Sequence, residues 1–218
     1  YQADLVLFLD ADVLVAGSLD NWLEGLLRER VVTGLPAHVD VLDKDMNAWE
    51  RLFAHCLLPE PCRDTLPSGV EILPDVAPRP MPTYWNLGVI AGPNDWMRRL
   101  GQNIVEELPR INTFISTYFR CQIAVALRLA RYQIPCKHMD IRYNFPNDPL
   151  FDAAYRDLVP DIRLLHFLRC TAQVDKSRDF SDQEHYDALL RRPGLTGSNL
   201  LLQQRLRALG PYPGDPLR

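Results

Sequence analysis

The sequence predicts an α/β protein, because apolar segments typical of strands alternate along the chain with segments of helical periodicity. The 218 residues are enough for one sizeable domain. Hydrophobic residues make up 47% of the chain and charged residues 24%, which is ordinary for a globular protein with a buried core. The sequence has no internal repeat and no low-complexity tract. We expect one domain over residues 1–192 and a C-terminal tail over residues 193–218, which contains Pro and Gly.

The N-terminal strands are predicted to lie inside the sheet. Residues 4–9 and 13–16 are almost entirely apolar and rich in Leu and Val, a composition typical of a central strand that is covered on both faces. Ser18 offers a helix N-cap, and the apolar residues that follow it at helical spacing predict an amphipathic helix over residues 19–29.

The remaining elements follow from the same two periodicities, two residues for a strand and 3.6 for a helix. The predicted strands are residues 31–35, 83–92, 134–145 and 162–168, and the predicted helices are residues 45–57, 94–107, 111–132 and 182–192, with a helical turn near 199–208. Residues 57–82 carry many of the 18 prolines and few periodic signals, so we expect a long irregular segment there.

Charge and cysteine content exclude several classes of protein. The formal net charge of −4 argues against a nucleic-acid-binding protein, and no apolar stretch approaches the roughly 20 residues that span a bilayer. The five cysteines are odd in number and scattered, which indicates reduced thiols and a cytoplasmic protein rather than a disulfide framework. A zinc site at His55, Cys56 and Cys62 would lack the second pair of ligands that a structural zinc needs.

Two acidic residues interrupt the apolar N-terminal segment. Asp10 and Asp12 are separated by one residue, so in an extended chain both side chains point to the same face. At the end of a strand in an open α/β sheet they would face the crevice where ligands bind. Neighbouring carboxylates repel each other unless a cation neutralises them, and carboxylate oxygens are ligands that Mg²⁺ and Mn²⁺ prefer. The pattern predicts a metal site; the structural alternative is a strand-end cap at Asp10 and a turn at Asp12.

Phosphatases of the haloacid dehalogenase type share this local pattern. In that family the first Asp is the nucleophile and the second is the general acid, which here would be Asp10 and Asp12. The family has Thr or Val two residues after the second Asp, where this chain has Leu14. It also has a later acidic pair at a strand end, which this sequence lacks. The phosphatase is therefore the weaker alternative.

Four segments resemble the GT-A glycosyltransferases of family 8, which are glycogenin-like or similar to bacterial lipopolysaccharide galactosyltransferases. The first, "DLVLFLDADVLVAGSLDNWLEGL" (residues 4–26), is similar to the strand, Asp-x-Asp motif and helix of that family. The others, in the family's order, are "YWNLGVIAG" (84–92), "FRCQIAVAL" (119–127) and "LLHFLRC" (164–170). The resemblance implies a Rossmann-like GT-A fold with a mixed sheet flanked by helices. Because the family's nucleoside-binding strands precede the Asp-x-Asp motif and this chain starts at Tyr1, we expect the N-terminal nucleotide-binding part to be missing.

The resemblance also implies a metal site and a catalytic site. Asp10, Asp12 and His166 would hold Mn²⁺ or Mg²⁺, and the metal would bridge the diphosphate of a nucleotide sugar. Asn86 would contact the donor sugar or the acceptor, and Gln122 would lie near the anomeric carbon. These last two are the candidate catalytic residues.

The resemblance implies two further donor-binding residues, and the sequence departs from the family pattern in three places. Gly88 would lie in the same donor-binding segment as the candidate asparagine, and Lys176 would supply positive charge to the phosphates. The family's lysine belongs to a Lys-Pro-Trp motif that this chain lacks, so Arg169 and Arg178 are alternative sources of that charge. Arg169 stands where the family has a glycine, and Cys121 stands where it has an aspartate.

These features predict a metal-dependent glycosyltransferase that moves a sugar from a nucleotide-sugar donor to an acceptor with retention. A UDP-sugar is the favoured donor, and the acceptor would be a glycan, a lipid-linked molecule or a protein. Residues 57–82 are expected to shape acceptor specificity, because long irregular segments beside a site commonly do so. The departure at Cys121 and the missing lysine motif leave an alternative, a GT-A-like domain that binds a partner or a glycan without catalysis.

Overall fold

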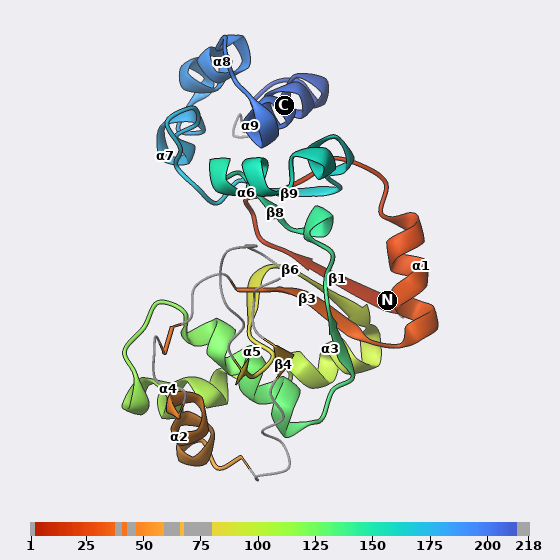
Figure 1. Cartoon of the computed structure of the whole chain (residues 1–218), viewed down its shortest axis with the longest axis vertical. Helices are drawn as coiled ribbons and strands as arrows, with labels where there is room; N and C mark the ends of the chain where they lie inside the picture. Colours follow the sequence, from red (N-terminus) through yellow and green to blue (C-terminus); the bar gives the residue numbers. More distant parts are fainter. Residues whose placement is uncertain (1–2, 38–40, 43–46, 59–65, 68–79, 213–218) are drawn as a thin grey trace. The chain divides into compact units, whose positions relative to one another are not determined.

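The computed structural model describes residues 3–37, 41–42, 47–58, 66–67 and 80–212. The chain falls into two compact units, Tyr1–Asp10 with Leu19–Asp140 and Ala11–Ser18 with Ile141–Arg218. Each unit combines strands with helices, which confirms the predicted α/β class (Figure 1). In the described ranges no helix has the length and apolar character that a membrane span requires. The expected boundary at residue 192 stays a prediction.

The sheet of the first unit is mixed, as predicted (Figure 1). Its strand order is β1 (Leu5–Leu9), β6 (Trp85–Pro93), β3 (Val32–Pro36) and β7 (Cys136–His138). Strands β1 and β3 run antiparallel to β6, and β7 runs parallel to β3. The strands expected at residues 4–9, 31–35 and 83–92 are confirmed.

The prediction that the N-terminal strands lie inside the sheet is wrong for β1, and also for residues 13–15, which form an edge strand of the sheet in the second unit. Among the described strands, β1 pairs with β6 alone and forms the edge of the sheet. Phe8 of β1 is 48% exposed, and with Leu87 and Ile90 of β6 it lines an apolar cavity of about 420 Å³. An apolar strand has the same composition whether another strand or a hollow lies beside it, so its sequence does not give its place in the sheet.

Helices α3 and α5 pack against β6 of this sheet. Val125 and Leu129 of α5 join Val32 and Ile90 in one buried cluster. The helices of the first unit are α1 (Asp20–Glu29), α2 (Ala48–His55), α3 (Asn94–Gly101), α4 (Leu108–Phe114) and α5 (Arg120–Arg131), with a 3-10 helix at Ile104–Glu107. Strands β4 (Leu66–Pro67) and β5 (Pro80–Met81) pair within the segment predicted as irregular, most of which lies outside the described residues.

Three predicted helix boundaries are corrected. The N-cap of α1 is Leu19 and not Ser18. The helix expected over residues 94–107 ends as an α-helix at Gly101. The helix expected over residues 111–132 is interrupted after α4, because Ile115 is extended (φ −146°, ψ 132°). The Thr117 hydroxyl then accepts the Phe119 N–H at 3.2 Å, and α5 starts at the next residue.

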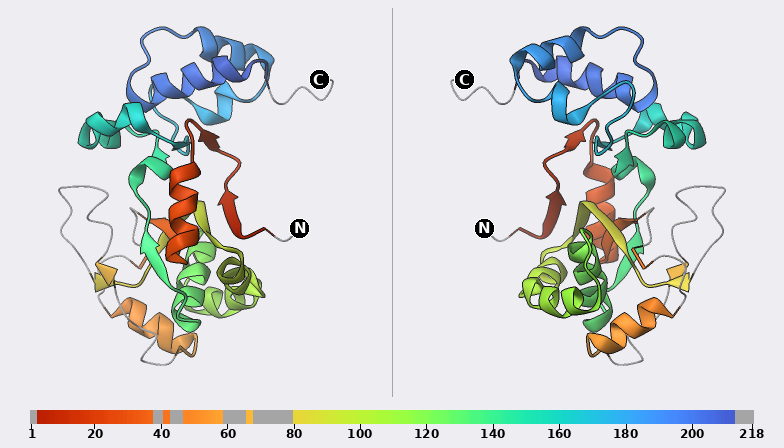
Figure 2. Two further views of the ribbon diagram at one scale, coloured as in Figure 1. Left: turned by 90° about the vertical axis from the view of Figure 1, so that its right-hand side faces the viewer. Right: turned by 90° about the vertical axis from the view of Figure 1, so that its left-hand side faces the viewer.

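The second unit is built on a three-stranded sheet. Strand β9 (Leu164–His166) lies between β2 (Val13–Val15), which is antiparallel to it, and β8 (Phe145–Pro146), which is parallel. The helices are α6 (Pro149–Ala154), α7 (Lys176–Asp179), α8 (Gln183–Arg191) and α9 (Gly197–Leu209), with 3-10 helices at Ile141–Tyr143 and Arg156–Asp161. Helices α8 and α9 lie side by side (Figure 2).

Predictions for the second unit are confirmed in part. The strand expected over residues 162–168 and the helix expected over residues 182–192 are present as β9 and α8. The strand expected over residues 134–145 is wrong as one element, because β7 ends at His138 and a 3-10 helix follows. The helical turn expected near 199–208 is a helix of 13 residues with Leu202 and Leu206 buried.

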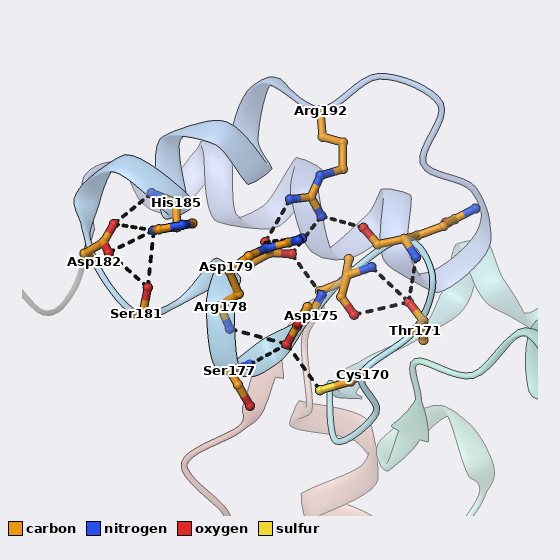
Figure 3. Close-up of polar contacts among 12 residues, drawn as sticks. Cys170, Thr171, Asp175, Ser177, Arg178, Asp179, Ser181, Asp182, His185 and Arg192 are labelled. Carbon is orange, nitrogen blue, oxygen red and sulfur yellow. Dashed lines mark hydrogen bonds and ion pairs between the residues drawn. The ribbon is translucent and has the colours of Figure 1, made fainter.

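An ion-pair network fixes α7 to the end of α8 (Figure 3). The buried Asp179 carboxylate accepts hydrogen bonds from both terminal nitrogens of Arg192, at 2.7 and 2.8 Å. The Asp175 N–H and the Arg178 Nε donate to the same carboxylate at 2.9 and 3.1 Å. Burial alone would raise the pKa of Asp179, but these hydrogen bonds outweigh it and lower the pKa to about 2. The network therefore holds a charged group in place at neutral pH, and with it α7, whose first residue is Lys176.

We expect Arg192→Leu to destabilise the protein strongly, because it leaves a buried carboxylate without its main partner. The free energy of unfolding at pH 7, measured in urea, should fall by about 3 kcal/mol or more. Arg191→Leu is the matched control, since the Arg191 side chain is 74% exposed and only approaches Asp187 at 4.0 Å. The control should change stability by less than about 0.5 kcal/mol. Equal losses in the two variants would contradict the role of the Arg192 ion pair.

Candidate functional site

Asp12 and His166 lie side by side because β2 pairs with β9. In this antiparallel pair Val13 lies opposite His166, and the Phe167 N–H donates to the Asp12 carbonyl at 3.0 Å. The side chains meet with Asp12 Oδ1 at 3.1 Å from His166 Nε2. Strand pairing thus brings together two residues that are far apart in the sequence.

The second oxygen of Asp12 contacts a lysine. Lys176 Nζ donates to Asp12 Oδ2 at 2.6 Å, and Lys176 begins α7 directly after its N-cap, Asp175. The hydrogen bond from His166 lowers the pKa of Asp12 far below its usual range; burial opposes this effect, and Lys176 adds to it. Asp12 is therefore a negative charge at physiological pH, with both oxygens held by donors from other elements.

A buried asparagine orients the His166 ring. Asn144 Oδ1 lies 2.9 Å from His166 Nδ1, and both residues are buried. This contact fixes the orientation of the ring, so that Nε2 is the nitrogen that faces Asp12. Metal-binding histidines are commonly held in this way by a partner on the other ring nitrogen.

Asp10 lies close to Asp12 and His166. Only Ala11 separates Asp10 from Asp12, and one ligand atom from each of Asp10, Asp12 and His166 lies within 4.8 Å of the other two. Two carboxylates and an imidazole are a ligand set that suits Mn²⁺ or Mg²⁺. The residues therefore fit a divalent cation, which would compete with Lys176 for the Asp12 carboxylate.

Asn86 and Gly88 lie in β6, beside the end of β1. The Asp10 N–H donates to the Gly88 carbonyl at 2.9 Å, and the Gly88 N–H donates to Asn86 Oδ1 at 2.9 Å. The Asn86 side chain thus binds the backbone of its own strand, the local geometry by which an asparagine stabilises a turn. The role of both residues in donor binding stays a prediction.

Gln122 lies in the first turn of α5. Its Oε1 is buried and has no hydrogen-bond partner among the described residues. A buried carbonyl oxygen without a donor costs about 1–3 kcal/mol, so this atom has a physical reason to bind a donor group of a ligand. Cys121, which stands where the family has an aspartate, is exposed.

The contact between Asn144 and His166 was not predicted from the sequence. The two residues are 22 positions apart, and a single asparagine before a short strand belongs to no motif. The register of β8 beside β9, in which Phe145 lies opposite Leu165, brings Asn144 close to the ring. The contact therefore depends on how two strands pair, and the sequence pattern does not predict that pairing.

A group of Ser181, Asp182 and His185 resembles a hydrolytic triad in composition only (Figure 3). His185 Nδ1 faces both Asp182, at 2.8 and 2.9 Å, and Ser181, at 3.4 Å. In a triad the acid and the hydroxyl bind different ring nitrogens. Asp182 also accepts the His185 N–H at 2.9 Å as the N-cap of α8, so the group stabilises the start of that helix.

Comparison with known proteins gives matches to solved structures of a glycosyltransferase. No family model matches the chain, and no curated protein matches it. Two of the matching structures are of the galactosyltransferase LgtC. One is an active-site mutant, with a TM-score of 0.47 at 14% identity, covering 96% of this chain and 62% of that chain. Another is LgtC with donor and acceptor sugar analogues, with a TM-score of 0.44 at 14% identity, covering 90% and 64%. The chain thus spans less than two thirds of the length of these structures.

Proposed function

We propose that this chain is part of a metal-dependent glycosyltransferase that transfers a sugar from a nucleoside-diphosphate sugar with retention. One observation carries the proposal. Asp12 of the Asp-x-Asp motif and His166 of the last family-like segment, both predicted from the sequence as ligands of one metal, have side-chain atoms 3.1 Å apart. A UDP-sugar is the donor that the sequence resemblance favours, and the acceptor would be a glycan, a lipid-linked molecule or a protein.

The leaving group sets the chemical problem for such an enzyme. A nucleoside diphosphate must leave while positive charge builds on the sugar ring. A metal held by Asp10, Asp12 and His166 would neutralise negative charge on the diphosphate. Lys176, next to Asp12, would donate a hydrogen bond to a phosphate oxygen, and Asn144 would keep His166 Nε2 turned toward the ligand position.

Gln122 is the residue that we assign to the donor sugar. Its buried Oε1 is an acceptor without a partner in the described part of the chain, and a sugar hydroxyl is a donor. Asn86 and Gly88, beside the end of β1, would line the donor site with it. In this proposal Gln122 and Asn86 contact the reacting sugar.

We expect Asp12→Asn to abolish Mn²⁺ binding and to slow release of nucleoside diphosphate by roughly 100-fold or more, because the ligand loses its charge. The assay mixes the protein with Mn²⁺ and a panel of nucleotide sugars. Electron paramagnetic resonance reports bound Mn²⁺, and a coupled assay reports released nucleoside diphosphate. Asp157→Asn is the matched control, since Asp157 is exposed in the same unit, and this variant should behave as the wild type.

Three outcomes would overturn the proposal. Mn²⁺-dependent nucleotide binding without any release would indicate the inactive binding domain. Cleavage of a generic phosphoester that Asp10→Asn abolishes would indicate the phosphatase. A wild-type protein that binds neither Mn²⁺ nor a nucleotide would remove the metal site altogether.

We expect Lys176→Met to bind Mn²⁺ roughly three- to tenfold more tightly than the wild type, because it removes the ammonium group 2.6 Å from Asp12 Oδ2. The same variant should bind nucleoside diphosphate more weakly when Mn²⁺ is present, since a phosphate partner is lost. Isothermal titration calorimetry measures both affinities. Lys137→Met, which removes a surface ion pair with Glu29, is the control and should change neither. Weaker Mn²⁺ binding by Lys176→Met would show that the lysine does not compete with the metal.

We expect Gln122→Leu to leave the free energy of unfolding unchanged or raised, because it removes a buried oxygen that has no described partner. Turnover should nevertheless fall by at least about tenfold if the amide contacts the donor sugar. Urea unfolding and the nucleoside diphosphate assay measure the two effects. Gln183→Leu, at a helical position whose amide binds Asp187, is the control and should retain turnover. A Gln122→Leu variant with wild-type turnover would exclude Gln122 from the reaction.

A further inference from the structure

The second unit contains a polar cavity of about 520 Å³ that none of the candidate site residues lines. It is bounded by α6, the 3-10 helix Arg156–Asp161, the loop at residues 171–173 and the start of α9. Its volume lies within the range of pockets that bind small molecules. The polar side chains that line it and carry the inference are Asp152, Arg156, Gln173, Thr196 and Asn199.

The charges of the cavity lining cancel. Asp152 is its single acidic residue and Arg156 its single basic one, among the described residues that line it. The Arg156 side chain is exposed and makes no hydrogen bond or ion pair with other described residues. An anionic ligand would meet the Asp152 carboxylate and a cationic ligand would meet the Arg156 guanidinium. The balance favours an uncharged ligand that both accepts and donates hydrogen bonds.

Asp152 is fixed in the wall by the first residues of α9. Both of its oxygens accept the Ser198 N–H, at 3.0 and 3.1 Å. Gly197, the residue before Ser198, has a φ of +55°, and a Cβ at this position would collide with the Asp152 carboxylate. A glycine at this place therefore allows the carboxylate to sit against the helix. The remaining lone pairs of Asp152 are acceptors for a ligand hydroxyl.

The opposite wall is held by a closed pair of hydrogen bonds. Gln173 Nε2 donates to Thr196 Oγ1 at 2.9 Å, and the Thr196 N–H donates to Gln173 Oε1 at 3.1 Å. Asn199 extends this wall, and its Oδ1 accepts from Asn147 Nδ2 at 3.3 Å. The Asn147 N–H in turn donates to the His166 carbonyl at 3.2 Å. The polar groups of the cavity are thus preorganised and are linked to the strand that carries His166.

We propose that this cavity binds a neutral sugar residue of a glycan. Vicinal hydroxyls of a sugar both donate and accept, so they match a lining that offers a carboxylate acceptor and a guanidinium donor. Val159 and Pro160 in the same lining give an apolar surface for the C–H face of the ring. Taken with the proposed function, on which this further step rests, the sugar would be a residue of the acceptor glycan.

The test is binding of uncharged sugars by the whole chain. The probes are the methyl glycosides and disaccharides of glucose, galactose and mannose, with glucuronic acid and glucosamine as charged comparisons. Saturation-transfer NMR detects binding, and calorimetry gives the affinity. Arg156→Ala removes the free guanidinium, and Ala153→Trp fills the cavity from an exposed lining position, so neither change disturbs the buried core.

We expect at least one neutral sugar to bind, and both variants to weaken that binding by about tenfold or more. Arg191→Ala, a change at an exposed arginine outside the cavity, should bind as the wild type does. Binding that both cavity variants leave intact would overturn the proposal, as would stronger binding of the charged sugars or no binding of any neutral sugar. Asp12→Asn should still bind the sugar, so a failure of the metal site and a failure of this cavity give different results.

Discussion

The negative charge of Asp12 is the constraint on which the candidate site depends. A partly buried carboxylate is costly unless cations or hydrogen-bond donors surround it, and here His166 and Lys176 take one oxygen each. Each of these two partners is in turn held in place by further hydrogen bonds or ion pairs. Asn144 binds the far nitrogen of the His166 ring, and the Asp179 network fixes the short helix that begins with Lys176. One charge thus organises residues from β9 and α7 together with the residues that precede β2 and β8.

The sequence could predict most of the elements, the identities of the main ligands and the meeting of Asp12 with His166, but not the other contacts of the site. The Asp-x-Asp motif and the family-like segment with His166 were enough to predict that Asp12 and His166 meet. Periodicity could not predict that β1 is an edge strand, because the neighbours of a strand are set by contacts with distant parts of the chain. It could not predict that the long helix breaks at Ile115 either, because that break depends on the dihedral angles of a single residue. Lys176 was predicted as a phosphate partner, and its contact with Asp12 comes from tertiary structure alone.

Two of the three departures from the family pattern, the missing lysine motif and Cys121, have different structural outcomes. Lys176 does not occupy the family's lysine position in the sequence, yet its ammonium lies 2.6 Å from the Asp-x-Asp carboxylate. A positive charge near the proposed diphosphate site is therefore present, although it comes from a different place in the chain. Cys121, which stands where the family has an aspartate, is exposed and lines the apolar cavity of the first unit. Of the two departures, only the loss of the aspartate remains as an argument for an inactive domain.

Hydrogen bonding, more than apolar packing, sets the positions of the functional groups in the second unit. Its buried polar residues include Asn144, Asn147, His166, Asp179, Asn199 and Gln203. Gln203 alone donates to two backbone carbonyls at 2.8 Å, those of Leu189 and Arg192. Apolar side chains can repack after a substitution with little loss of compactness, whereas a buried polar group tolerates only geometries that satisfy its partners. Hydrogen bonds of this kind fix the direction of a carboxylate or a ring nitrogen more narrowly than apolar packing alone would, and such fixed directions are what metal and sugar binding require.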